Sequence, residues 1–152
     1  MKQSPQLQKI QEEMQKGGLS LEGFLGEDTR PIIDIILEDQ EMVTSLGLTN
    51  EIIADGLEEL SQLAMTTPKE WVPITNEFEV RAEEYRGRIA CPFKHPGLFS
   101  KNHVEAKHLK LTNSIYWSDL SIHLIRKHGF YQGRGAYYRI NPKDIRYILN
   151  SK

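Results

Sequence analysis

The chain has 152 residues, of which 39% are hydrophobic and 26% charged, a balance typical of a soluble globular protein. A single cysteine excludes an intramolecular disulfide, and no apolar run is long enough to span a membrane. The N-terminus lacks the apolar core of a signal peptide, so we expect a cytoplasmic protein.

The formal net charge of −2 conceals a strong asymmetry between the two halves of the chain. Residues 1–77 contain 15 acidic and 5 basic residues, whereas residues 78–152 contain 6 acidic and 14 basic residues. This split indicates either an acidic part that docks on a basic part, or a charged surface that meets an external partner.

The first half predicts helices. Ser4 followed by Pro5 is typical of a helix start, because the serine caps the first turn and proline fits the first helical position. Further helices are expected over about 29–47 and 49–65, where apolar residues recur every three or four positions. We interpret these helices as scaffold rather than as an active site.

The second half predicts short strands and two more helices. Expected strands cover 78–81, 85–90, 104–111, 114–117 and 137–140. A helix is expected from Ser118, its N-cap, to a stop at Gly129, and a last helix from Asn141. We therefore predict an α+β fold: an acidic helical lobe over 1–66, a linker over 67–77, and a basic α+β lobe over 78–152.

All five histidines and the only cysteine lie between Cys91 and His128. Cys91 and His95 form one close pair, and His123 and His128 form a second pair on a predicted helix. Thiolate and imidazole are the side chains that hold zinc, and a structural zinc takes four such ligands in a tetrahedron. The sequence therefore predicts a zinc site made of Cys91, His95, His123 and His128.

This order of a turn and a later helix resembles the Cys/His zinc-finger-like modules over residues 88–130. In those modules a turn supplies two ligands and a following helix two more, and the resemblance implies a structural zinc in a small zinc-finger-like lobe. His108 is the main substitute ligand, whereas His103 is expected on the opposite face of its strand. Asp119, one turn before His123, is a candidate to hold its second ring nitrogen.

A segment rich in glycine, tyrosine and arginine covers residues 129–139. Arginine binds phosphate and tyrosine stacks on bases, so a nucleic-acid surface is one interpretation. The candidate contacts are Arg126, Lys127, Arg134 and Arg139. The favoured alternative is a turn-rich connection whose aromatic residues pack over the core, with the basic charge facing the acidic helices.

We expect a non-catalytic, zinc-binding structural or interaction module whose partner is nucleic acid or an acidic protein surface. A metal- or thiol-dependent enzyme centred on Cys91 and the histidines stays open as a second class. It is less favoured because the sequence shows no constellation of acid, base and electrophile. A third class is a metal-free protein that self-associates into a homo-oligomer through its charge asymmetry.

Overall fold

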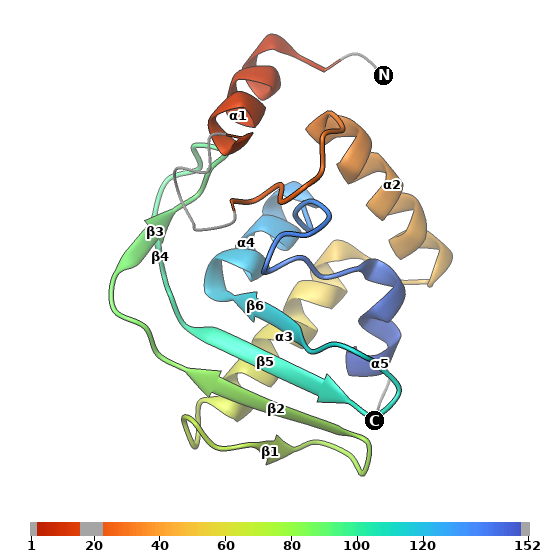
Figure 1. Ribbon diagram of the computed structural model, residues 1–152, viewed down its shortest axis with the longest axis vertical. Coiled ribbons are helices and arrows are strands. Elements are labelled where there is room, and N and C mark those ends of the chain that lie inside the picture. The colour runs from red at the N-terminus through yellow and green to blue at the C-terminus, as the bar shows by residue number, and fades with distance from the viewer. Residues whose placement is uncertain (1–2, 16–22, 150–152) are drawn as a thin grey trace.

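The computed structural model describes residues 3–15 and 23–149 (Figure 1). Its helices are α1 (Pro5–Gln15), α2 (Ile32–Ser45), α3 (Asn50–Ala64), α4 (Asp119–His128) and α5 (Ile145–Leu149), the last preceded by a short 3-10 helix, Pro142–Asp144. Its strands are β1 (Val72–Pro73), β2 (Phe78–Glu83), β3 (Arg88–Ala90), β4 (Leu98–Ser100), β5 (His103–His108) and β6 (Ile115–Ser118). The fold is α+β, as the sequence predicts.

The helix starts are fixed by local caps. The Ser4 hydroxyl accepts a backbone N–H of the first turn of α1 at 3.1 Å, and Thr49 does the same for α3 at 3.1 Å. Ser118 forms a reciprocal capping box with the third residue of α4. Gly129 ends α4 in the left-handed conformation, with φ of 61°. The predicted caps and the predicted stop of α4 are confirmed.

The main sheet has four antiparallel strands in the order β1-β2-β5-β6. Alternate residues of these strands face inward and pack against α3, which lies behind the sheet in Figure 1. At the centre of this contact Trp117 is fully buried, and its indole N–H donates to the Ser61 hydroxyl at 2.8 Å. Strands β3 and β4 pair separately as a two-stranded sheet beside α4.

Three strand predictions need correction. The strand expected over 104–111 ends at His108, and only Arg88–Ala90 of the segment 85–90 is extended in a sheet. The strand expected over 137–140 is wrong, because this segment turns. The backbone N–H of Arg139 donates to the carbonyl of Ala136 at 3.1 Å, which closes a turn where a strand would continue.

Ion pairs join the acidic and basic halves of the chain. Arg126 on α4 contacts three carboxylates of α3, Arg139 contacts Asp39 of α2, and Lys94 contacts Glu13 of α1. The main hydrophobic cluster also takes residues from α3 and from the sheet. These contacts agree with docking of the acidic helices on the basic part, while the division at 1–66, 67–77 and 78–152 stays a prediction. No helix among the described residues is long and apolar enough to cross a membrane.

Gly133 explains part of the glycine-rich segment without any ligand. Its backbone N–H donates to the carbonyl of Phe24 at 2.8 Å, and a Cβ at this position would lie 2.3 Å from the carbonyl oxygen of Leu25. We expect Gly133→Ala to lower the free energy of unfolding by about 1–3 kcal/mol, because backbone must shift. Urea denaturation of the wild type and of Gly133→Ala measures this loss. Equal stability of Gly133→Ala and wild type would contradict the expectation.

Candidate metal centre

The candidate ligands come from two elements that are distant in sequence. Cys91 directly follows β3, and His95 lies in the same connection to β4. The carbonyl of Cys91 accepts the N–H of Lys94 at 3.1 Å in a tight turn, and Lys94 adopts a positive φ of 66°. His123 and His128 belong to α4, which contacts β4. The turn and the helix thus place a thiol opposite two imidazoles.

The structure brings three of the four predicted ligands close together. One ligand atom from each of Cys91, His123 and His128 lies within 4.8 Å of the other two, and this group could hold a metal ion. The Sγ of Cys91 is 3.5 Å from the Nε2 of His128. The ring of His95 is exposed, but its centroid lies 4.8 Å from that of His123 and 5.8 Å from that of His128.

The two helical histidines converge although they are five residues apart. On an ideal helix such residues differ in direction by about 140°. The backbone nevertheless stays α-helical at the end of α4, because the N–H of Gly129 donates to the carbonyl of Ile125 at 3.1 Å. The rings of His123 and His128 still lie 5.3 Å apart, centroid to centroid. The long imidazole side chains therefore bridge the angular gap.

Apolar and aromatic side chains surround the cluster. Phe93 stacks on His128, with centroids 4.3 Å apart and an interplanar angle of 14°, and Phe99 lies 4.4 Å from the ring of His123. Cys91 is 3% exposed and belongs to a hydrophobic cluster that includes Met14 of α1. This shell limits water access, which strengthens the bonds between a metal and its ligands.

The electrostatics of the cluster favour neutral imidazoles. Burial lowers the pKa of His123, and together with the neighbouring imidazoles of His128 and His95 it brings this pKa to about 4. Burial and the nearby His95 also lower the pKa of His128. Neutral imidazole is the form that binds a metal. The two helical histidines are therefore held in the protonation state that coordination requires.

One polar atom of the cluster lacks a partner. Within residues 3–15 and 23–149, the Nε2 of His123 is buried and makes no hydrogen bond. A buried nitrogen without a partner costs about 1–3 kcal/mol, and native structures leave few such atoms. A metal ion at the cluster offers one way to satisfy a ring nitrogen of His123.

Other histidines and Asp119 do not join the cluster. The predicted contact of Asp119 with His123 is not observed, because Asp119 accepts a hydrogen bond from the Ser100 hydroxyl. His108 lies in contact with Tyr147, 5.2 Å between centroids, and is not part of the three-residue group. His103 contacts the Tyr138 hydroxyl at 3.2 Å. Within the described part of the chain, neither His108 nor His103 belongs to the group that could hold a metal, so nothing supports them as substitute ligands.

The basic residues proposed for nucleic-acid binding lie in different surroundings. The guanidinium of Arg139 pairs with the buried Asp39, and Arg126 pairs with carboxylates of α3. Arg134 is 3.5 Å from Glu38. Lys127 is exposed on α4. The interface with nucleic acid stays a prediction, and the three arginines already neutralise acidic residues of the fold.

Sequence reasoning missed the aromatic shell of the centre. Phe93 lies two residues after Cys91, and Phe99 follows in β4. The available signal was the position of Phe93 between the two predicted turn ligands, Cys91 and His95. Phe99 carried no such signal, since its approach depends on how β4 packs on α4.

Comparisons with known proteins add no relative. No protein-family model matches the chain, and neither the curated proteins nor the solved structures give a significant match. The inference of function therefore depends on the geometry and chemistry of the chain itself.

Acid should destabilise the metal-free protein through His123. Its folded-state pKa of about 4 lies below the ordinary histidine value of 6.5, so the unfolded chain binds this proton first as pH falls. Stability from this group should decline by about 1–3 kcal/mol between pH 6.5 and pH 4 and then level off. Urea unfolding with a chelator at pH 7 and pH 4.5 measures the loss, and His123→Gln should show a smaller one. An equal loss in both proteins would contradict this expectation.

Proposed function

We propose that the protein is a non-catalytic binding module stabilised by one zinc ion, with Cys91, His95, His123 and His128 as its ligands. The observation that supports this most strongly is the approach of one thiol and two imidazoles within 4.8 Å of one another. These groups come from separate segments and converge inside an apolar shell. Polar side chains without a shared ligand would instead point away from one another into solvent. The neutral imidazoles and the unsatisfied Nε2 of His123 support the same proposal.

Zinc is the metal that fits this donor set best. A mixture of thiolate and imidazole suits zinc, while magnesium and calcium prefer oxygen ligands. The nearby ring of His95 would supply the fourth ligand after a change of its side-chain rotamer. Four protein ligands would close the coordination sphere and leave no position for a reacting water, which is the basis for a non-catalytic role.

The metal would stabilise a weakly paired part of the fold. Strands β3 and β4 have three residues each, and a two-stranded sheet of this size is marginal without further support. A zinc ion would tie the connection between these strands to α4. The module would then present a rigid basic surface that includes Lys127 to a nucleic acid or an acidic protein surface.

An enzyme is the competing class, because a catalytic zinc uses three protein ligands and one water. The exposure of His95 is the observation that favours it. His95→Ala discriminates between the classes when the metal is replaced by cobalt, whose absorption reports its ligands. A changed spectrum with weaker binding supports four protein ligands, and an unchanged spectrum supports an open site.

Zinc titration of chelator-treated protein tests the proposal. We expect one zinc site per chain in the wild type and at least about a hundredfold weaker binding in His123→Gln, since one ligand is lost. His108→Gln is the matched control, because it removes a buried histidine outside the cluster. Equal zinc affinity in wild type and His123→Gln would exclude the proposed ligand set.

A further inference from the structure

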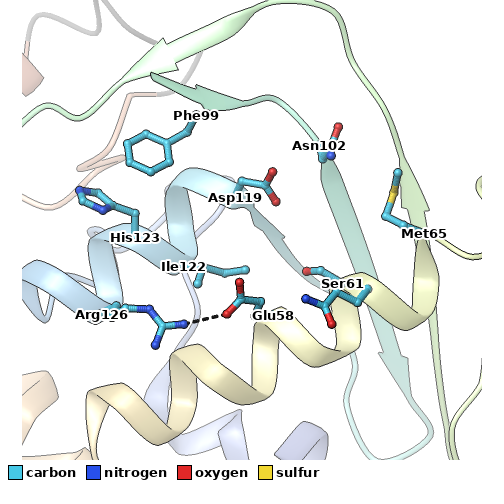
Figure 2. Close-up of a pocket in the computed structure, with 10 residues that line it drawn as sticks. Glu58, Ser61, Met65, Phe99, Asn102, Asp119, Ile122, His123 and Arg126 are labelled. Carbon is cyan, nitrogen blue, oxygen red and sulfur yellow. Dashed lines mark hydrogen bonds and ion pairs between the residues drawn. The ribbon is translucent and has the colours of Figure 1, made fainter. Parts of the chain in front are cut away.

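A groove lies between α3 and α4 beside the candidate metal centre (Figure 2). Its lining residues are Glu58, Ser61, Gln62, Met65, Phe99, Asn102, Asp119, Ile122, His123 and Arg126. The volume is about 490 Å³, which falls within the range of sites that take small molecules. The groove therefore has the size and the mixed polar and apolar lining of a ligand site.

The charge of the groove is negative. Arg126 is the basic residue of its lining, and its guanidinium is 2.6 Å from both Glu51 and Asp55 and 3.0 Å from Glu58. Of these three carboxylates, Glu58 lines the groove, so the lining carries two acidic residues, Glu58 and Asp119, against one arginine. A zinc ion bound by one thiolate and neutral imidazoles would contribute only a single net positive charge. The groove consequently attracts cations and repels anions.

Asp119 offers a specific contact for such a cation. Its Oδ2 accepts a hydrogen bond from Ser100, whereas its Oδ1 accepts none from the residues that the structure describes. In the view of Figure 2, Ile122 lies between Asp119 and Glu58. Free carboxylate oxygen and adjacent apolar surface are the two features that an alkylammonium group needs.

One residue that lines the groove is buried and has a ring nitrogen without a hydrogen-bond partner among the described residues. His123 is 8% exposed, lines the groove, and has an Nε2 without a hydrogen-bond partner in the described part of the chain. Apolar contact comes from Ile122, Met65 and Phe99. The aromatic ring of Phe99 can also attract a cation through its face.

We propose that this groove binds a small organic cation, a primary alkylammonium, with its nitrogen at Asp119 and its chain against Ile122 and Met65. The proposal goes beyond the zinc module and does not require the metal, because the negative residues belong to α3 and α4. Because His123 belongs to both sites, binding at one site would change the affinity of the other.

Three six-carbon probes that differ only in charge test this site. Hexylamine, hexan-1-ol and hexanoate are titrated into isotopically labelled full-length protein, with zinc and separately with a chelator, while amide NMR shifts are followed. We expect saturable shifts at α3 and the first turns of α4, strongest with hexylamine, weaker with hexan-1-ol and absent with hexanoate. Binding of hexylamine should weaken as salt is raised.

Two substitutions locate the cation contact. Asp119→Asn should weaken hexylamine binding by about tenfold, because a charge-assisted hydrogen bond is lost, and should leave hexan-1-ol unaffected. Asn102→Lys places a positive charge at the rim, away from the cap of α4, and should weaken hexylamine similarly. Glu41→Gln removes an exposed acid of α2 outside the groove and should bind as the wild type does.

Specific outcomes would overturn the proposal. Equal affinity for hexylamine and hexan-1-ol, unchanged hexylamine binding in both groove variants, or shifts confined to other surfaces would each exclude an alkylammonium site. Zinc content is measured on the same samples. Wild-type protein that binds hexylamine without holding zinc would refute the proposed zinc module alone, whereas zinc-loaded protein that ignores hexylamine would refute the groove alone.

Discussion

Removal of zinc is expected to lower the free energy of unfolding by about 3–4 kcal/mol when free zinc otherwise exceeds its dissociation constant by about 100- to 1,000-fold. The reason is that the unfolded chain does not hold Cys91 next to His123 and His128, so binding stabilises the folded state. Urea unfolding at pH 7 with added zinc and with a chelator measures the difference. Hydrogen exchange should rise first at β3, β4 and the end of α4, where the ligands lie.

The ligand variant Cys91→Ser/His123→Ala provides the comparison. It should show the same stability with zinc and with chelator, because two ligands are gone, while His108→Gln should keep the full response. If the wild type shows no response to zinc while it remains folded, the role of the metal in stability is refuted. A response that persists in the double variant would place the metal elsewhere in the chain.

Loss of the ion pair between Asp39 and Arg139 should have a comparably large effect. The guanidinium donates to both carboxylate oxygens, at 2.7 and 3.0 Å, and also to the carbonyl of Gln132 at 2.8 Å. The side chains are 6% and 14% exposed. We expect Asp39→Asn to lower the free energy of unfolding by about 3–5 kcal/mol, because the arginine charge stays buried without its partner.

A double substitution distinguishes the cost of an unpaired buried charge from the cost of lost packing. Asp39→Leu/Arg139→Met should recover part of the loss, because it removes both charges from the interior. Glu41→Gln, which changes an exposed acid two residues away, should leave urea unfolding unchanged. A loss below about 1 kcal/mol for Asp39→Asn would show that this contact does not dock the acidic helices on the basic part.

Much of the helical framework could be predicted because its signals are local. Ser4, Thr49, Ser118 and Gly129 cap or stop helices through bonds to neighbouring residues, so sequence spacing is sufficient. The strand expected over 137–140 failed for the opposite reason. The β-favouring residues Tyr137, Tyr138 and Ile140 are overridden there by a turn, and by the guanidinium of Arg139, which reaches across to α2.

The candidate site was predictable in composition but not in shape. The spacing of the cysteine and the histidines predicted the ligand set, and three of its members lie close together among the described residues. Neither the exposure of His95 nor the hydrogen bond that holds Asp119 away from His123 follows from spacing. Both depend on how β4 packs against α4, which links residues separated by a hairpin.

The proposed zinc site is tested by the metal content per chain, from elemental analysis of protein purified without a histidine tag or a chelator. We expect about one zinc per chain, retained through gel filtration and lost in the Cys91→Ser/His123→Ala variant. Folded protein that contains no metal and takes up no added zinc would contradict it, and would leave the Cys91, His123 and His128 cluster as packing alone.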